Sequence, residues 1–364
     1  MGGEIFTLFF TRALVEIGIP VTLFVAARNA FWRDADLAGV APVPIEDARD
    51  LIGAIPDAPA LVVTNGPVPQ AALAQLAQRH LLSGFAHMPA HGRDTSGYRK
   101  LDTVFCVSQY VIDGLREDGL TNVYPHPFYG VAEFRRYRSS DLRVVARSPY
   151  AWDRRKVRDR VLGWFLADKP AQRVPAAFER KPGLTLGIVS GLVPIKQFPL
   201  LFRHLAPILQ DYPQVNVEIF GAGGYGQVRD LLAALAPIRK RVRLWGRQPA
   251  PELVYPQIDY LMTGLPEKEA LGLNVIEAQA CGTPVLAVAA PPFVETVLDG
   301  RTGYLYQDPR RDGGADFRRV LEHILASSRP NPLLETAHLD NFGAPAFRAR
   351  VEAMFDYLER RLPV

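Results

Sequence analysis

Two carboxylates eight residues apart are the side chains whose type and spacing most directly suggest chemistry in this sequence. Glu269 and Glu277 flank the run Ala-Leu-Gly-Leu-Asn-Val-Ile, and Gly282 and Pro284 follow. The run is typical of a loop that enters a helix near Gly272, where free N–H groups suit a phosphate. On a regular helix this spacing places the carboxylates about 12 Å apart along the axis. That is wider than the roughly 5 to 9.5 Å of a glycosidase acid/base pair. The spacing suits two contacts with different parts of one elongated ligand. The structural alternative is a helix start at which one glutamate caps the helix and the other is exposed to solvent.

The elements that must position these carboxylates are short β-branched runs that alternate with helical runs, and this alternation occurs twice. In the first half the predicted strands are 21–25, 61–64, 84–87, 104–107 and 123–124, and the predicted helices are 4–17, 70–80 and 109–118. In the second half the predicted strands are 184–189, 215–220, 242–245, 260–262 and 285–288, and the helices are 198–210, 228–236, 251–256, 273–280, 316–326 and 346–361. Such alternation builds parallel, doubly wound sheets. The sequence therefore predicts an α/β fold of two Rossmann-like domains that face each other across a cleft.

The expected domain boundary lies near Arg180. Residues 133–180 break the alternation with an arginine-rich stretch that contains several prolines, so we assign 1–180 to the first domain and 181–340 to the second. Residues 341–364 carry a helix behind a loop punctuated by proline and glycine. We expect this last helix to pack back on the first domain.

Composition excludes several classes of protein. Of the 364 residues 48% are apolar and 22% are charged, which is the balance of a globular protein with a real core. No window approaches 18 uncharged apolar residues, so we expect neither a membrane span nor a secretory signal. Cys106 and Cys281 cannot form a disulfide framework, which favours a reducing compartment and a cytoplasmic location.

Positive charge is concentrated in one segment. Residues Arg135 to Arg160 carry a net charge of +7, whereas the whole chain carries +4, so the charge forms a local patch and does not indicate a nucleic-acid partner. Trp152, Val157, Val161, Trp164 and Phe165 recur there at roughly helical spacing. Such a helix could lie on anionic lipid as a peripheral membrane contact at the inner face of the membrane. An interdomain helix with a solvated basic face is the alternative.

The carboxylate run resembles the signature of retaining GT-B glycosyltransferases of glycosyltransferase family 4, which typically reads E-G-F-G-L-x-x-x-E-A-M-A-C-G-x-P-V. Other segments resemble motifs of this family in the same order along the chain. Gly2-Gly3-Glu4 resembles the family's N-terminal glycine loop. The family's later strands and turns are resembled by residues 188–196, 217–224, 242–247 and 295–303. The family's glycine loop normally follows a first β-strand. We therefore expect that the true start lies upstream of Met1 or that the first domain lacks this strand.

The resemblance assigns roles to individual residues. It implies that Glu277 holds the ribose of a nucleotide, that Glu269 contacts hydroxyls of the transferred sugar, and that Lys196 meets the diphosphate. Gly191 stands where the family usually has an arginine that helps to neutralise the diphosphate, a charge that Arg247 could supply instead. The predicted donor-binding residues are Gly2, Gly3, Gly191, Lys196, Arg247, Leu271, Gly272, Leu273, Asn274 and Glu277.

Two histidines follow a predicted strand of the first domain, at the end where α/β sites gather. These are His87 and His91. Members of the family often carry a functional histidine in a comparable position near the transferred sugar, so the resemblance favours His87 as a catalytic residue beside Glu269 and Lys196. Ordinary loop histidines are the alternative.

A glycine-rich run offers a competing function. Gly221 to Gly226 match G-x-G-x-x-G between a strand and a helix, as in dinucleotide-binding oxidoreductases. That fingerprint requires an acidic residue about 20 positions later. The region holds Arg239, Lys240, Arg241 and Arg243 instead, so only an NADP site would fit.

The resemblance thus implies a retaining, metal-independent hexosyltransferase of polysaccharide or glycoconjugate synthesis. It would move a sugar from a nucleoside diphosphate to a glycan, lipid-linked or small-molecule acceptor, without a cofactor. The one Asp-x-Asp run, Asp34 to Asp36, lies far from the diphosphate segments and reads as a solvated loop. The second hypothesis is a non-catalytic nucleotide-sugar-binding or scaffold protein, which Gly191 and the Pro291-Pro292 loop favour.

Overall fold

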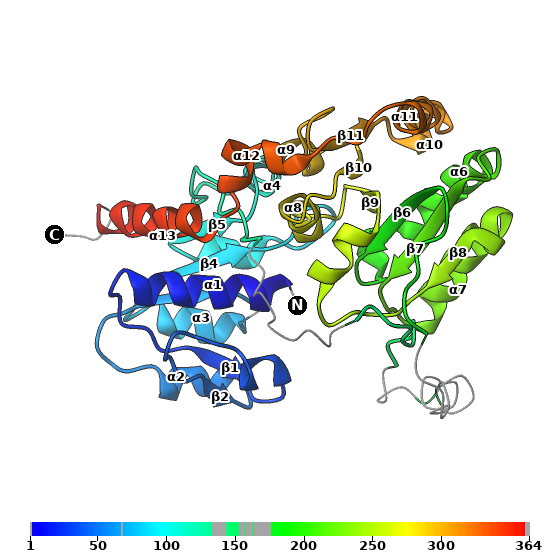
Figure 1. The fold of residues 1–364 in the computed structure, drawn as a ribbon. Helices are drawn as coiled ribbons and strands as arrows, with labels where there is room; N and C mark the ends of the chain where they lie inside the picture. The colour runs from blue at the N-terminus through cyan, green and yellow to red at the C-terminus, as the bar shows by residue number, and fades with distance from the viewer. Residues whose placement is uncertain are drawn as a thin grey trace. The chain divides into compact units, whose positions relative to one another are not determined.

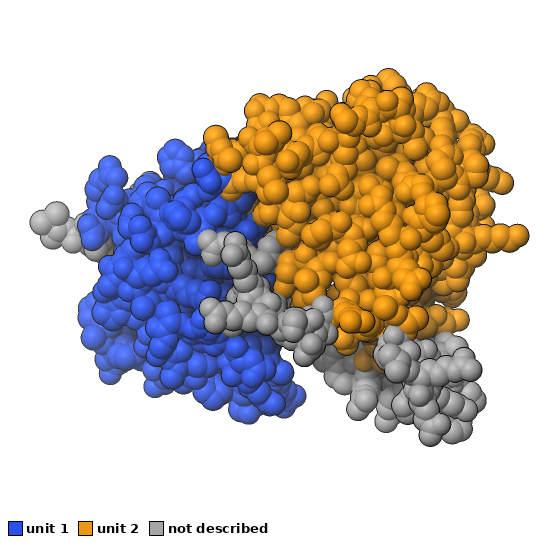
Figure 2. Space-filling model, viewed as in Figure 1, with its two compact units in different colours: residues 1–133, 340–364 blue, residues 134–339 orange. Residues whose placement is uncertain are grey.

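The structure, a computed structural model, describes residues 2–66, 68–132, 143–152, 157, 163 and 176–360. The chain divides into two compact units, shown in different colours in Figure 2. Unit 1 comprises Met1–Glu133 and Asp340–Val364, and unit 2 comprises Phe134–Leu339. Among the described residues, no helix combines the length and the apolar character that crossing a membrane would require.

Unit 2 is built on one six-stranded sheet in the order β11-β10-β9-β6-β7-β8 (Figure 1), and every neighbouring pair of strands is parallel. The strands are β6 (Leu184–Val189), β7 (Val215–Phe220), β8 (Val242–Leu244), β9 (Tyr260–Met262), β10 (Val285–Val288) and β11 (Gly303–Tyr306). Counted from β6, this is the 3-2-1-4-5-6 order of the Rossmann fold. The direction of winding reverses between β6 and β9, and ligands of such sheets bind beyond the carboxyl ends of the strands at this switch point.

Helices and helical turns cover both faces of this sheet. They are η4 (Pro194–Lys196), α6 (Phe198–Gln210), α7 (Tyr225–Ala234), η5 (Ala236–Arg241), η6 (Pro251–Leu253), η7 (Tyr255–Gln257), α8 (Leu273–Ala280), α9 (Phe293–Thr296), α10 (Pro309–Asp312), α11 (Ala315–Ala326), η8 (Pro332–Leu334) and α12 (Thr336–Asp340). Along β6, Leu186 and Ile188 join the core beneath α6, α7 and α11, whereas Val189 joins the core beneath α8 and α9. Burial on both faces explains the nearly continuous apolar runs of these strands.

Unit 1 is smaller and contains two groups of parallel strands. One is the pair β1 (Phe24–Ala26) and β2 (Val43–Ile45), and the other is the sheet of β3 (Leu61–Thr64), β4 (Leu81–Ala86) and β5 (Thr103–Cys106) in the order β3-β4-β5. Its helices are α1 (Gly2–Glu16), η1 (Ala30–Arg33), η2 (Ala48–Asp50), α2 (Leu51–Ala54), α3 (Gln70–Leu76), η3 (Ser96–Lys100), α4 (Gln109–Glu117) and α13 (Ala344–Glu359). The predicted α/β class is therefore confirmed, with parallel strands and crossover helices in each unit.

The C-terminal helix belongs to unit 1 although the chain reaches it last. α13 packs against α1, and Phe347 of α13 meets Phe6 of α1 edge to face, with ring centroids 5.2 Å apart. Phe6 also contacts Phe85 of β4 at 4.7 Å. Aromatic edge-to-face pairs of this kind add to the stabilisation that area burial provides, so both ends of the chain hold the core of unit 1 together.

The division between the units differs from the boundary expected near Arg180. Val144 is buried in the core of unit 2, and the Phe178 N–H donates to its carbonyl at 2.8 Å. The Arg147 N–H donates to the carbonyl of Trp245 at 3.0 Å, and the Ala151 N–H to that of Gly223 at 2.8 Å. The arginine-rich composition suggests a linker, but these backbone bonds tie the described part of the segment to unit 2. Of the predicted basic helix from Trp152 to Phe165, only Trp152, Val157 and Gly163 lie among the described residues.

The predicted N-terminal glycine loop is also corrected. Gly2 and Gly3 form the first turn of α1 and not a loop. The side chains that follow explain the helix, because Phe6, Leu8, Phe9, Phe10 and Leu14 are all buried. A helix that is apolar around most of its circumference is stabilised by packing on several sides.

Candidate active site

The switch point of unit 2 brings together two of the predicted catalytic residues. Lys196 ends η4, which follows the carboxyl end of β6, and Glu269 lies in the loop that follows β9. The Lys196 Nζ forms an ion pair and hydrogen bond with Glu269 Oε2. Both side chains are largely shielded, at 18% and 14% exposed. The fold therefore places one ammonium group and one carboxylate where α/β sheets bind ligands.

Backbone packing fixes the position of Lys196. The Leu265 N–H donates to the Lys196 carbonyl at 3.2 Å, and a Cβ at Gly264 would lie 1.9 Å from that carbonyl oxygen. Only glycine allows so close an approach. The loops after β6 and β9 are thus packed directly against each other. The lysine cannot shift without moving the loop that carries Glu269.

The second predicted carboxylate, Glu277, lies in α8 and is held by a residue that sequence reasoning missed. The fully buried Tyr255 donates its hydroxyl to Glu277 Oε2 at 2.7 Å. Burial raises the pKa of Glu277, and the Tyr255 hydrogen bond and the nearby Lys196 ammonium oppose this rise. Tyr255 is itself anchored, because Thr283 Oγ1 donates to its carbonyl at 2.6 Å. Nothing in the spacing of Tyr255 and Glu277, 22 residues apart, signals their contact.

The start of α8 lies between the two glutamates. Gly272 caps the helix with φ +79°, a left-handed conformation that glycine adopts without strain, and Leu271 before it is buried. Asn274 Nδ2 donates to the Val189 carbonyl at the end of β6, at 3.3 Å. Leu273 and Asn274 are the first residues of the helix, and N–H groups at such a start have no partner within the helix. N–H groups at a helix start suit an anion in general.

The glycine-rich run 221–226 has a structural explanation. A Cβ at Gly221 would come within 1.9 Å of the Ser190 carbonyl oxygen, and one at Gly223 within 2.1 Å of that of Leu192. The Leu192 N–H donates to the Ala222 carbonyl at 3.0 Å. Small residues are thus required where this loop packs on the loop after β6. That packing requirement explains the glycines, and no bound dinucleotide is needed to explain them.

Two further predicted donor residues are exposed. Gly191 lies on the loop between β6 and η4, and a Cβ there would make only an ordinary 3.8 Å contact with Val193. Arg247 follows β8, and among the described residues its side chain is not a partner of Lys196, Glu269 or Glu277. The structure therefore leaves the assignment of Arg247 as a prediction. It also leaves room for a longer side chain at position 191.

The cysteine beside this site does not have the properties of a nucleophile. Burial, together with the carboxylates of Glu277 and Glu252, raises the pKa of the Cys281 thiol to about 12. A thiol with so high a pKa carries almost no thiolate at neutral pH.

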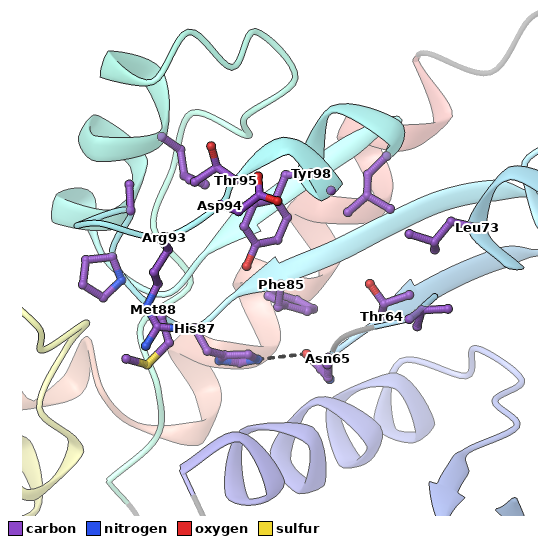
Figure 3. Close-up of a pocket in the computed structure, with 17 residues that line it drawn as sticks. Thr64, Asn65, Leu73, Phe85, His87, Met88, Arg93, Asp94, Thr95 and Tyr98 are labelled. Atoms are coloured by element: carbon purple, nitrogen blue, oxygen red, sulfur yellow. Dashed lines mark hydrogen bonds between the residues drawn. The ribbon is translucent and has the colours of Figure 1, made fainter. Parts of the chain in front are cut away.

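In unit 1, His87 follows β4 and is held in one tautomer by a chain of hydrogen bonds. Its Nε2 lies 3.0 Å from Asn65 Oδ1 (Figure 3). Asn65 Nδ2 donates to Thr7 Oγ1 at 2.9 Å, and Thr7 Oγ1 donates to the Gly3 carbonyl at 2.9 Å. Because the Thr7 proton is used on Gly3, Thr7 accepts from the amide of Asn65, whose carbonyl oxygen then faces His87. His87 thus carries its proton on Nε2 and leaves Nδ1 as an acceptor.

Burial also sets the charge of His87. It lowers the pKa of the imidazole to about 4, against the opposing effect of the Glu4 carboxylate. The ring packs edge to face on Phe6, with centroids 4.9 Å apart. His87 is therefore neutral at physiological pH. The alternative histidine, His91, is exposed at the surface.

A pH dependence of stability follows from His87. The folded-state pKa lies below the ordinary 6.5, so the unfolded chain takes up the proton first, and stability falls as the pH drops from about 6.5 to about 4. With about 1.4 kcal/mol per pKa unit, the loss is about 3 kcal/mol. Urea unfolding at pH 7.0 and pH 4.5 should show a smaller pH effect in His87→Gln than in the native chain. The exposed-site variant His91→Gln should keep the full effect, and an equal effect in all three proteins would contradict this assignment.

Comparison with known proteins bears on both units. Residues 172–323 match the family model described as glycosyl transferases group 1. A GDP-mannose-dependent alpha-(1-6)-phosphatidylinositol monomannoside mannosyltransferase of Mycolicibacterium smegmatis is 32% identical over 123 residues, which are 32% of this chain and 32% of the relative. A D-inositol 3-phosphate glycosyltransferase of Rhodococcus erythropolis is 33% identical over 178 residues, 44% of this chain and 38% of the relative. The match thus spans only about a third of each relative's length.

Solved structures resemble nearly the whole chain. Sucrose-phosphate synthase from Thermosynechococcus elongatus has a TM-score of 0.68 at 15% identity and covers 99% of this chain and 94% of its own. Anabaena HepE in complex with UDP and glucose has a TM-score of 0.60 at 16% identity. The match covers 98% of this chain and 96% of the HepE chain. The fold is therefore the α/β fold of two Rossmann-like units found in GT-B glycosyltransferases.

Proposed function

We propose that this protein is a retaining, metal-independent glycosyltransferase that uses a nucleoside diphosphate sugar. The observation that carries the proposal is the convergence of Lys196, Glu269 and the start of α8 at the switch point of unit 2. Lys196 and the first N–H groups of α8 are fixed positive groups that would stabilise a departing diphosphate. Similarity of this unit to glycosyl transferases group 1 supports the same function.

The remaining site residues would contact different parts of the donor. Glu277, oriented by Tyr255, would accept hydrogen bonds from the ribose hydroxyls through the oxygen that Tyr255 does not occupy. Glu269 would accept from hydroxyls of the transferred sugar, and Lys196, its present partner, would then contact the diphosphate. In the reaction the bond between the sugar C1 and the diphosphate oxygen breaks while an acceptor oxygen bonds to C1 on the same face. The acceptor proton leaves with the diphosphate, so the reaction requires no nucleophilic side chain.

A non-catalytic nucleotide-sugar-binding protein is the second proposed function. It is favoured by Gly191, which supplies no charge where the resembling family has arginine, and by the Lys196–Glu269 pair, in which the lysine is already neutralised. Both functions include binding of the nucleotide sugar, but only the first includes its turnover.

The test combines binding with turnover. We expect one of UDP, GDP, ADP and TDP, or its sugar conjugate, to raise the melting temperature of the native chain and not that of Glu277→Ala, because a ligand at 100 times its Kd adds about 2.7 kcal/mol of stability. The selected sugar nucleotide should then be hydrolysed or transferred in the presence of EDTA, and the anomeric configuration of the product should match that of the donor. Binding without turnover would favour the scaffold, and binding of none of the nucleotides would contradict both proposals.

A gain of affinity is expected from Gly191→Arg. The open space around the Gly191 Cβ accommodates the side chain, which would bring a second cation to the loop that precedes Lys196. One charge-assisted contact to phosphate should tighten binding of the selected nucleoside diphosphate by about 10-fold at low salt. Calorimetric titration should show this gain shrinking as salt increases.

The matched control for this gain is Gly191→Gln, which adds a shorter polar side chain without charge. Equal gains in both variants would indicate contacts unrelated to the diphosphate. No gain in Gly191→Arg would place the phosphates away from this loop.

A further inference from the structure

One guanidinium connects two loops at the carboxyl end of the sheet of unit 2. Arg310 donates from Nη1 to Glu267 Oε1 at 2.7 Å and from Nη2 to Glu267 Oε2 at 3.2 Å. Glu267 lies in the loop after β9, whereas Arg310 lies in α10, which follows β11. Both side chains are partly buried. Two parallel N–H···O bonds between a planar guanidinium and a carboxylate hold both groups in one orientation.

A second carboxylate anchors this guanidinium to its own helix. Asp308 caps α10 by accepting the Arg310 backbone N–H at 3.0 Å, and it also accepts from Arg310 Nε at 2.9 Å and from Nη2 at 2.5 Å. Single ion pairs near the surface contribute little, but bidentate geometry within a network of charges is the exception. Arg310 is therefore fixed to the start of α10 while it holds Glu267.

The charges agree with this geometry. Burial would raise the pKa of Glu267, but hydrogen bonds, above all from Arg310, outweigh it and hold this pKa below its ordinary value. The hydrogen bond from Arg310 also lowers the pKa of Asp308. Both carboxylates are thus ionised at neutral pH. Removing the guanidinium would leave two like charges on neighbouring loops.

The carboxylate that Arg310 holds belongs to the turn that ends at Glu269. The Glu269 N–H donates to the Pro266 carbonyl at 2.8 Å, so residues 266–269 form a β-turn in which Glu267 is the first of the two central residues. In so short a turn, the position of Glu267 fixes the backbone of Glu269. The residue before the turn is held from the other side, where the Leu265 N–H donates to the Lys196 carbonyl.

We propose that Arg310 is a positioning residue of the donor site, which acts through Glu267 to hold the turn that presents Glu269 to the transferred sugar. The inference rests on the proposed glycosyltransferase function, in which Glu269 accepts hydrogen bonds from hydroxyls of that sugar. Glu277, which is proposed to bind the ribose, lies on α8 and is held by Tyr255 instead. Loss of Arg310 should therefore weaken binding of the sugar and spare binding of the nucleotide.

The test compares the Kd of a nucleoside diphosphate with the Kd of its sugar conjugate. The full chain is titrated calorimetrically with whichever of UDP, GDP, ADP and TDP the thermal screen selects, and with the corresponding UDP-glucose, GDP-mannose, ADP-glucose or TDP-glucose. Arg310→Gln should weaken binding of the sugar conjugate about 5-fold and that of the nucleoside diphosphate less than about 2-fold, a coupling typical of residues in one hydrogen-bond network. Arg311→Gln is the matched control, because Arg311 is the adjacent, exposed cation of α10, and it should keep the native ratio of the two Kd values.

Two further variants separate positioning from a purely structural role. Glu267→Gln removes the same contact while Arg310 stays on Asp308, and it should change the ratio of the two Kd values as much as Arg310→Gln does. In a Glu269→Ala background, Arg310→Gln should leave the ratio unchanged, because the side chain that Arg310 positions is absent. The loss of melting temperature caused by Arg310→Gln should, in contrast, be the same in both backgrounds.

Three results would overturn the inference. They are an unchanged ratio in Arg310→Gln, an equal change in Arg311→Gln, and the same change in the Glu269→Ala background as in the native chain. Any of these results, combined with nucleotide binding that depends on Glu277, rejects the inference and leaves the proposed function standing. An unchanged ratio in Glu269→Ala itself rejects the sugar contact of Glu269 together with the inference. Binding of none of the nucleotides rejects the proposed function and the inference alike.

Discussion

Replacing Lys196 by methionine should lower kcat/KM for sugar transfer by about 100- to 1000-fold, the usual cost of removing one fixed group that stabilises developing charge. The ammonium lies at the switch point of unit 2, held by the backbone of the Gly264 loop and paired with Glu269. Methionine keeps the length and apolar stem of lysine while it removes the charge. The effect should fall on the chemical step, because the charge on the diphosphate increases as its bond to the sugar breaks.

Loss of stability must be separated from loss of catalysis in this experiment. Lys196→Met leaves the Glu269 carboxylate shielded and without its cation, which is destabilising in its own right. The double variant Lys196→Met/Glu269→Gln removes that unpaired charge and should recover melting temperature without recovering transfer. Lys268→Met is the matched control, since Lys268 is an exposed neighbour, and it should transfer at the native rate. Transfer by the double variant at more than half the native rate would show that Lys196 has a structural role only.

Much of unit 2 could be predicted from the sequence because its strands are buried on both faces. The predicted bounds of β6, β7, β9, β10 and α8 are those observed, since continuous apolar runs between turn residues give a clear signal. β2 and β11 were not predicted. β2 contains a proline in a three-residue strand, and β11 begins with a glycine, residues that ordinarily argue against a strand.

The contacts that define the two sites could not be predicted in the same way. Thr7 and Asn65 are 58 residues apart, and Lys196 and Glu269 are 73 apart. Periodicity reports which face of an element is buried, but it carries no information on which side chains meet across elements. The family resemblance identified Lys196 and Glu269, and the rule that sites form at the carboxyl ends of strands identified the region of His87. Asn65, which follows β3 directly, could have been found by that rule, whereas Tyr255 lies in a short turn with no such signal.

The second large effect is expected at Glu277. Removing a charged acceptor for the ribose hydroxyls should weaken binding of the selected nucleoside diphosphate by about 100-fold in Glu277→Ala, since hydrogen bonds to charged groups contribute roughly 1.5–3 kcal/mol. The native chain should also bind the 2′-deoxy or 3′-deoxy nucleotide more weakly than the ribonucleotide, as measured by calorimetric titration. In Glu277→Ala this preference should disappear. Equal preference in both proteins would place the ribose elsewhere.

Tyr255→Phe should reduce the same preference through geometry alone. The ring stays in the core, but Glu277 Oε2 loses the Tyr255 hydroxyl as a donor, so the carboxylate is no longer held in one orientation. We expect binding of the ribonucleotide to weaken by about 10-fold, the value of one hydrogen bond to a charged group near its lower limit, and binding of the deoxynucleotide to change little. Tyr260→Phe is the matched control, because Tyr260 is equally buried and its hydroxyl has no hydrogen-bond partner in the described part of the chain. A purely structural role for Tyr255 would weaken both nucleotides alike and leave their ratio unchanged, whereas a positioning role changes the ratio itself.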